Sequence, residues 1–203
     1  MYLSSKVAIQ SRYIRDRNVV LLLVGLVWLA IGAGFGPDIA THILSRASPY
    51  PLIVHAHALA FVGWLVLLTV QVLLIRNNLP QLHRQLGIGG IVLAAAMMIL
   101  GPTTALYGAR VQFGTPQSDP LFLLVQLTDM VAFAGLVLAA VPLRKVAASH
   151  KRLILLATIY LTDARFGRIT GTSLEKQLGS SFWPFFGEVY SVWRHVDRGH
   201  RNI

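Results

Sequence analysis

Three polar side chains recur at seven-residue intervals inside a long apolar segment of the sequence. The segment covers residues 51–86, and the three side chains are His57, Trp64 and Gln71. Residues seven apart share one face of an α-helix, so these side chains form a single stripe. A helix that only had to sit in lipid would not need this stripe, because polar groups are costly in hydrocarbon. The stripe therefore predicts an internal polar site in a membrane protein.

Ionisable residues of three different apolar segments are expected at one depth in the membrane. With a rise of about 1.5 Å per helical residue, His57, Asp129 and Asp163 all fall in the outer third of the bilayer. Such groups normally face the protein interior and pair with one another. The three residues could hold a metal ion or pass protons; the structural alternative is that they form only hydrogen bonds and ion pairs. His55 is expected nearer the surface, on the opposite face of its helix.

Two short stretches each place a histidine beside a cation at the expected inner end of an apolar segment. One contains His83 and Arg84, and the other begins with His150. Paired imidazoles from two helices can bind a haem iron, so His83 and His150 are predicted ligands of a b-type haem. Trp64 is a further predicted cofactor contact, because its ring could stack on a planar group; the alternative is that Trp64 is an aromatic residue of the packed core. The alternative is that Arg84 and its neighbours anchor the helix ends at lipid headgroups.

The composition indicates that most of the chain faces lipid or other helices. Apolar residues make up 55% of the 203 residues and charged residues only 13%, whereas soluble domains carry roughly a quarter charged residues. We expect an all-α fold, a polytopic transmembrane bundle of five or six spans. The expected spans are residues 19–36, 52–75, 86–107, 121–142 and 150–169, with a doubtful sixth at 181–194.

The distribution of charge predicts three regions and an orientation. A basic cytoplasmic N-terminus (1–18) precedes the five-span bundle (19–169), and residues 170–203 hold a loop, the doubtful sixth span and a basic tail. With six crossings and the N-terminus inside, 13 of the 18 Lys and Arg residues fall on the inner side, as expected for a bacterial-type inner membrane protein. No basic stripe with interleaved aromatic residues lies outside the spans, so the net charge does not indicate nucleic-acid binding.

The sequence lacks the residues that several other kinds of site require. It has no cysteine, which excludes disulfides, Fe–S clusters, thiolate metal sites and covalently attached haem. Non-covalent haem and a His/carboxylate metal site are compatible with it. The G-x-S-x-G, H-E-x-x-H and P-loop motifs are also absent, so the sequence does not indicate a hydrolase or a transferase of the soluble type.

Taken together, the motifs resemble a group of bacterial membrane proteins of unknown function. The resemblance covers residues 51–165 and rests on His55-x-His57, Trp64, Gln71, His83-Arg84-x-Leu86-Gly87 and His150-Lys151-Arg152-Leu-x-Leu-Leu-Ala-Thr with a later Asp. It implies a multi-span inner-membrane protein and no particular activity. A weaker resemblance to cytochrome b561-type proteins implies six spans and haem ligands on spans two to five. His83 and His150 match one such pair, but the expected fourth span has no histidine to partner His57.

Three classes of function stay open from the sequence. The first is binding of b-type haem or a metal cofactor in membrane electron transfer or its assembly, with the bilayer as surroundings and a membrane redox partner. The second is a small proton-coupled transporter, in which the outer His and Asp residues carry protons. The third is a non-catalytic membrane scaffold, in which every polar group is structural.

Overall fold

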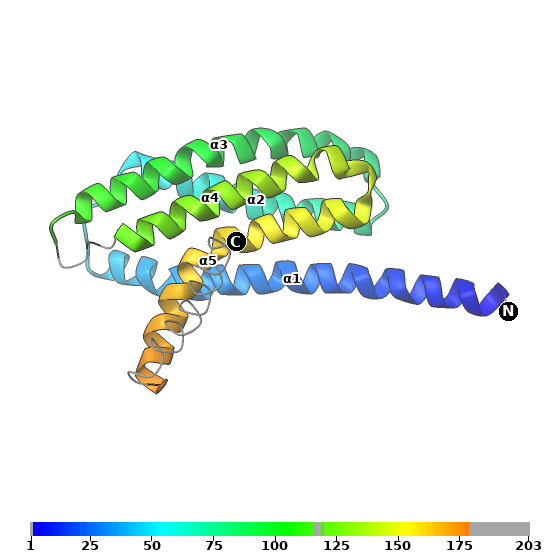
Figure 1. Ribbon diagram of the computed structural model, residues 1–203, viewed down its shortest axis with the longest axis horizontal. Coiled ribbons are helices and arrows are strands. Elements are labelled where there is room, and N and C mark those ends of the chain that lie inside the picture. Colours follow the sequence, from blue (N-terminus) through cyan, green and yellow to red (C-terminus); the bar gives the residue numbers. More distant parts are fainter. Residues whose placement is uncertain (1, 116–117, 119, 179–203) are drawn as a thin grey trace, which may run out of the picture. The chain divides into compact units, whose positions relative to one another are not determined.

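The computed structural model describes residues 2–115, 118 and 120–178, with side chains described for 18–115, 118 and 122–162. All elements in this part of the chain are helical, which confirms the all-α prediction (Figure 1). They are α1 (Tyr2–Leu44), α2 (Leu52–Arg76), α3 (Pro80–Gln112), α4 (Pro120–Ala140), the 3₁₀ helix η1 (Pro142–Lys145) and α5 (Ala147–Leu178). The doubtful span at 181–194 lies outside the described residues.

Within the described residues, four helical segments are long and apolar enough to cross a membrane. They are Asn18–Leu44, Leu52–Arg76, Pro80–Gln112 and Phe122–Ala140. The first is longer than the span expected at 19–36, because Pro37 lies inside a continuous helix instead of ending it. The third is longer than the span expected at 86–107, because α3 already begins at Pro80 and continues to Gln112. The chain is therefore an all-helical protein whose apolar helices suit a lipid bilayer.

Helices α2 and α3 form a close antiparallel pair. Gly63 faces Leu93, and Gly90 lies so near Leu67 that an added Cβ would approach its side chain to 3.2 Å. The turn between the helices needs a positive φ at Asn78, a residue type that tolerates this conformation. Small residues such as Gly63 and Gly90 let two helices pack closely. Close packing matters in a membrane, because there is no hydrophobic driving force between helices in lipid.

Helix α3 also packs against α4, and α1 packs against α2 (Figure 1). At the α3–α4 contact, Gly101 is buried and the Met130 sulfur occupies the space where a Cβ would otherwise lie. At the α1–α2 contact, the Trp28 Nε1–H donates to the Thr69 hydroxyl at 3.0 Å. The packing is thus made of small residues and interhelical hydrogen bonds, as is usual inside membranes.

The core joins side chains of five helices around Trp64. This residue is 5% exposed; its Nε1–H donates to the Thr158 hydroxyl of α5 at 3.1 Å. Its ring meets the edge of Phe133 of α4, with ring centroids 5.1 Å apart. Val27 of α1 and Met97 of α3 complete the cluster. The chain divides into two units between Ala164 and Arg165, and the site described next lies within the first.

Candidate functional site: a cavity between two histidines

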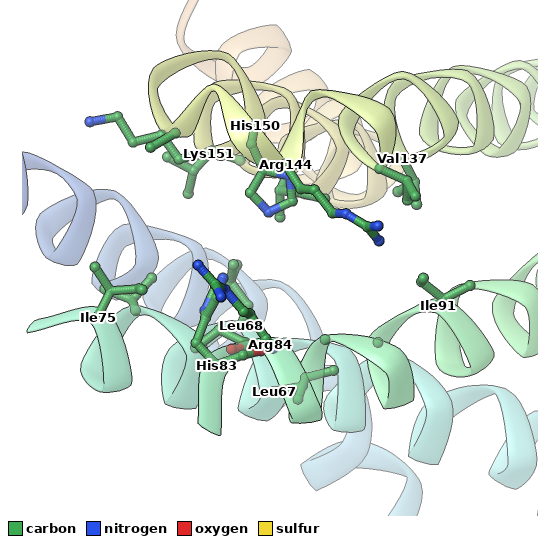
Figure 2. Close-up of a pocket in the computed structure, with 18 of the residues that line it drawn as sticks. Leu67, Leu68, Ile75, His83, Arg84, Ile91, Val137, Arg144, His150 and Lys151 are labelled. Atoms are coloured by element: carbon green, nitrogen blue, oxygen red, sulfur yellow. Dashed lines mark hydrogen bonds between the residues drawn. The ribbon is translucent and has the colours of Figure 1, made fainter. Parts of the chain in front are cut away.

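A cavity of about 1030 Å³ lies between two walls of the helix bundle (Figure 2). One wall consists of α2 and α3, and the other consists of the end of α4, η1 and the start of α5. We call this space the histidine cavity, because His83 lines one wall and His150 lines the other. Its deeper lining is aliphatic and includes Leu67, Ile91 and Val137. Small-molecule sites of proteins have volumes of about 300–1,000 Å³, so the histidine cavity is large enough for a cofactor.

The two histidines face each other across the cavity. Their ring centroids are 6.4 Å apart and their ring planes are nearly perpendicular, at 88°. His83 lies in the first turn of α3, and His150 lies in the first turn of α5. Because α4 runs between them in the opposite direction, both helices start at the same end of the bundle. This topology brings together two residues that are 67 positions apart in the sequence.

The orientation of His150 follows from the way α4 ends. Pro142 follows closely after α4, and the chain tightens into η1, where the Arg144 N–H donates to the Val141 carbonyl. In a continuing α-helix that N–H would have bonded to the Ala140 carbonyl. The Ala140 carbonyl instead accepts the Nδ1–H of His150 at 2.9 Å. A carbonyl only accepts, so the Nδ1 atom carries a proton. In a neutral ring with this tautomer, the Nε2 atom keeps its lone pair.

The opposite wall contains two buried polar atoms without a hydrogen-bond partner among the described residues. They are the Nδ1 atom of His83 and the Oε1 atom of Gln71. The Gln71 amide nitrogen donates to the His83 backbone carbonyl at 3.1 Å, which ties α2 to the first turn of α3. A buried polar atom that lacks a partner is costly, by about 1–3 kcal/mol. Both residues line the histidine cavity.

Cationic side chains line the cavity from both walls, and Arg76 and Lys151 are among them. Arg84 follows His83 on one wall, and Arg144 and Lys145 belong to η1 on the other. Figure 2 shows Arg84 and Arg144 directed into the space between the walls. No acidic residue is among the lining residues in the part of the chain that the structure describes. The charged part of the described lining is therefore entirely cationic.

The chain was compared with protein-family models, with curated proteins and with solved structures. None of them matches it. Its function is therefore argued from the geometry of the histidine cavity alone.

The three residues of the polar stripe are all at least partly buried. Trp64 is buried and Gln71 is partly buried, and both line the cavity. His57 is partly buried, near Phe61 with ring centroids 6.5 Å apart, and its Nδ1 atom has no hydrogen-bond partner among the described residues. The Trp64 N–H already donates a hydrogen bond to Thr158, so only the face and edge of the ring could contact a ligand.

The outer set of ionisable residues is only partly described. Asp129 is buried at 7% exposure, whereas His55 is exposed and its Nδ1 atom lies 3.2 Å from the Pro51 carbonyl oxygen. The side chain of Asp163 lies outside the described residues. Among the described residues, no group of three or more His, Asp or Glu side chains could hold a metal ion. The metal site at His57, Asp129 and Asp163 stays a prediction.

Two features of the cavity were not expected as site residues from the sequence. Arg144 and Lys145 counted only as inner-side charges, although they lie six and five positions before His150. The available signal was their position in the sequence: they follow Pro142, which ends an apolar segment, and they precede His150. The second feature is the Ala140 carbonyl, a backbone atom that becomes available only through the 3₁₀ geometry of η1.

Proposed function

We propose that this chain is an integral membrane protein that binds one b-type haem in the histidine cavity, with His83 and His150 as the two axial ligands. The observation that carries the proposal is the pair of imidazoles 6.4 Å apart across a cavity of about 1030 Å³. A bond between a metal ion and an imidazole nitrogen is about 2 Å long. Two imidazoles that bind one metal ion from opposite sides then have ring centroids about 6 Å apart. The observed separation is of this size.

The surroundings of His83 and His150 also support these two residues as the ligands. Histidines that bind metals commonly donate their second N–H to a backbone carbonyl, which fixes the tautomer and the ring orientation. The bond from His150 to the Ala140 carbonyl is of this kind. The aliphatic side chains Leu67, Ile91 and Val137 would surround an apolar macrocycle. On the opposite wall, the Nδ1 atom of His83 has no hydrogen-bond partner among the described residues.

A haem with two histidine ligands takes up and releases one electron without an open position for a substrate. The chain would therefore serve electron transfer within the membrane, or its assembly, together with a membrane redox partner. Its residues would hold the haem, exclude water through the aliphatic lining, and set the potential through the bonds of the two imidazoles.

The finer topology belongs to the same proposal. The end of the bundle at which Arg84, Arg144 and Lys145 lie would face the cytoplasm, because cytoplasmic loops carry an excess of Lys and Arg. This places the start of α1 inside and gives α5 the role of a fifth span. A sixth span would follow only at 181–194. The location would be a bacterial-type inner membrane.

The test of the proposal is an absorption spectrum of the full chain, purified in detergent from haem-replete cells. We expect a Soret band and, after reduction with dithionite, the sharp visible bands of a six-coordinate low-spin b-type haem. The haem should extract into acidified organic solvent, because the chain has no cysteine to hold it covalently. A colourless protein from cells that load a control b-type cytochrome would refute the proposal.

Filling the cavity should also displace the haem without touching a ligand. Gly87 lies one helical turn after His83 and lines the cavity, where an added Cβ would meet only the Gln71 amide at 3.8 Å. A Gly87→Leu side chain would project into the space between the walls. We expect the haem content per protein to fall at least about tenfold, which requires only about 1.4 kcal/mol, as measured by the pyridine haemochrome assay.

The matched control for this substitution is Gly89→Leu in the same helix. Gly89 is exposed, does not line the cavity, and has no atom within 4 Å of an added Cβ among the described residues. We expect its haem content to equal that of the wild type. Equal haem content in both variants would show that the ligand does not occupy the histidine cavity.

A further inference from the structure

The two histidines of the cavity differ in what holds their Nδ1 atoms, although they lie on facing walls (Figure 2). The Nδ1–H of His150 donates to the Ala140 carbonyl at 2.9 Å. The Nδ1 atom of His83 is buried and has no hydrogen-bond partner among the described residues. An imidazole that binds a metal ion through Nε2 carries its proton on Nδ1, and an acceptor for this proton fixes the ring. His150 has such an acceptor already, whereas His83 still needs one.

The backbone before His83 does not serve as this acceptor. His55 and His83 occupy equivalent positions, four residues after the N-caps Pro51 and Leu79 of their helices. The Nδ1 atom of His55 lies 3.2 Å from the Pro51 carbonyl oxygen. The Leu79 carbonyl accepts the backbone N–H of His83 at 3.2 Å, but it makes no bond with the ring. The acceptor for His83 must therefore come from a side chain.

The Gln71 amide contacts His83 and has an acceptor to spare. Its nitrogen donates to the His83 backbone carbonyl at 3.1 Å. Because a carbonyl only accepts, this bond fixes which end of the amide is the nitrogen. The other end, Oε1, is buried and has no hydrogen-bond partner among the described residues. An added Cβ at Gly87 would lie 3.8 Å from the amide nitrogen, so the amide lies against the first turns of α3, where His83 is.

We propose that Gln71 is the positioning residue of His83. Its Oε1 atom accepts the Nδ1–H of His83, directly or through one water molecule, when the Nε2 atom of His83 binds the haem iron. This inference rests on the proposed function. An acceptor that lacks a donor and a donor that lacks an acceptor are complementary, and pairing them satisfies two buried polar atoms. The two ligands are then held in different ways, His150 by a backbone carbonyl and His83 by a side chain of the neighbouring helix.

The proposed bond acts on the haem through the basicity of the imidazole. An acceptor for the Nδ1–H makes the ring a more basic and therefore a stronger ligand. A stronger ligand favours the more positive ferric iron, so it lowers the reduction potential. The Ala140 carbonyl is a backbone atom, which a side-chain substitution leaves in place. Position 71 is therefore where a change of sequence adjusts the potential through one ligand only.

The test compares Gln71→Leu with Gln71→Glu in the full chain, purified with haem in detergent. Leucine has no hydrogen-bonding atom in its side chain, so it removes both the acceptor and the donor of the amide. Glutamate keeps an acceptor oxygen, but its carboxylate has no proton for the His83 carbonyl. We expect the reduction potential, measured by spectroelectrochemical titration, to rise in Gln71→Leu. It should stay at or below the wild-type value in Gln71→Glu, because a carboxylate is a strong acceptor.

A second measurement reports on the bond between His83 and the iron. Carbon monoxide binds to a six-coordinate ferrous haem only by displacing a ligand, and loss of an outer-shell partner weakens a ligand by about 10–100-fold. Gln71→Leu should therefore bind carbon monoxide at least about tenfold more tightly than the wild type, whereas Gln71→Glu should not. The matched control is Gln85→Leu, at an exposed position of α3 that does not line the cavity. It should keep the wild-type potential and carbon monoxide affinity.

The outcomes separate a positioning role from a structural one. If Gln71 only ties α2 to α3 through its amide nitrogen, Gln71→Glu loses this bond as well. Both variants would then bind carbon monoxide more tightly to a similar extent, or both would lose their haem, and either result would overturn the inference. Loss of haem from Gln71→Leu alone supports it.

Two other results also overturn the inference. One is a wild-type potential and carbon monoxide affinity in Gln71→Leu, and the other is an equal change in Gln85→Leu. In both cases haem binding by His83 and His150 stands. If the wild type itself shows no six-coordinate haem spectrum, the proposed function fails, and the inference fails with it.

Discussion

Alanine in place of His150 is expected to lower the affinity for haem at least about 100-fold, because loss of an outer-shell partner alone can reach this size. His83→Ala should have the same effect, since each variant leaves only one of the two imidazoles that lie 6.4 Å apart. Any haem that is retained should be five-coordinate and high-spin. The measurement is the reduced absorption spectrum of the purified variants, together with titration of the haem-free proteins.

Rescue by a free ligand distinguishes coordination from folding. Imidazole added to His150→Ala should restore the six-coordinate spectrum, because the variant leaves space where the side chain was. The control variants are His42→Ala and His55→Ala, which change histidines that do not line the cavity. Both should keep the wild-type spectrum. A low-spin six-coordinate spectrum in the double variant His83→Ala/His150→Ala, without added imidazole, would exclude these residues as the ligands.

The second large effect is expected on stability, at Trp64. The Trp64→Ala substitution removes a ring that is 5% exposed, its edge contact with Phe133 and its hydrogen bond to Thr158. Truncation of a buried aromatic residue lowers the free energy of unfolding by about 3–5 kcal/mol. We expect a loss of this size because Trp64 of α2 joins α4 and α5 in one cluster. The measurement is unfolding in mixed micelles by added SDS, followed by far-UV circular dichroism.

Two further variants define the origin of this loss. Trp64→Phe keeps an aromatic ring and removes the N–H, so it should lose only about 1 kcal/mol, the net value of one hydrogen bond. Trp28→Ala removes a residue that is only partly buried and packs at the edge of the core, so its effect should be smaller than that of Trp64→Ala. Equal losses at Trp28 and Trp64 would contradict the central position of Trp64.

The helices were predictable from the sequence because each apolar run is longer than any strand or buried loop requires. The ends were less predictable. Pro37 and Pro102 lie inside helices that continue past them, because contacts between helices outweigh the loss of one backbone bond at a proline. Depth in the membrane follows from counting residues. The rotation of a helix about its axis depends on packing, which the sequence does not show. The sequence therefore predicted one depth for His57, Asp129 and Asp163, but not whether they are in contact.

The proximity of His83 and His150 is a different case. Both residues were expected at the inner ends of helices that run in the same direction, and this topology alone restricts them to one end of the bundle. The spacing of 6.4 Å depends on more than topology. It requires the close approach of α2 and α3 at Gly90 and the 3₁₀ turn after Ala140 that orients His150. Such local backbone geometry leaves no periodic signal in the sequence.

The division of the histidine cavity into two walls has a consequence for the biogenesis of the protein. Helices α2 and α3 leave the ribosome before α4, η1 and α5, and they carry His83 into the bilayer while the chain that contains His150 is still being translated. A nascent chain thus presents half of a binding site, with one imidazole and Arg84, for the time needed to synthesise the 67 residues up to His150. Insertion of α4 and the turn into α5 then completes the site. Loading of the proposed haem would therefore follow insertion of the second helical hairpin, and this step would act as an assembly checkpoint.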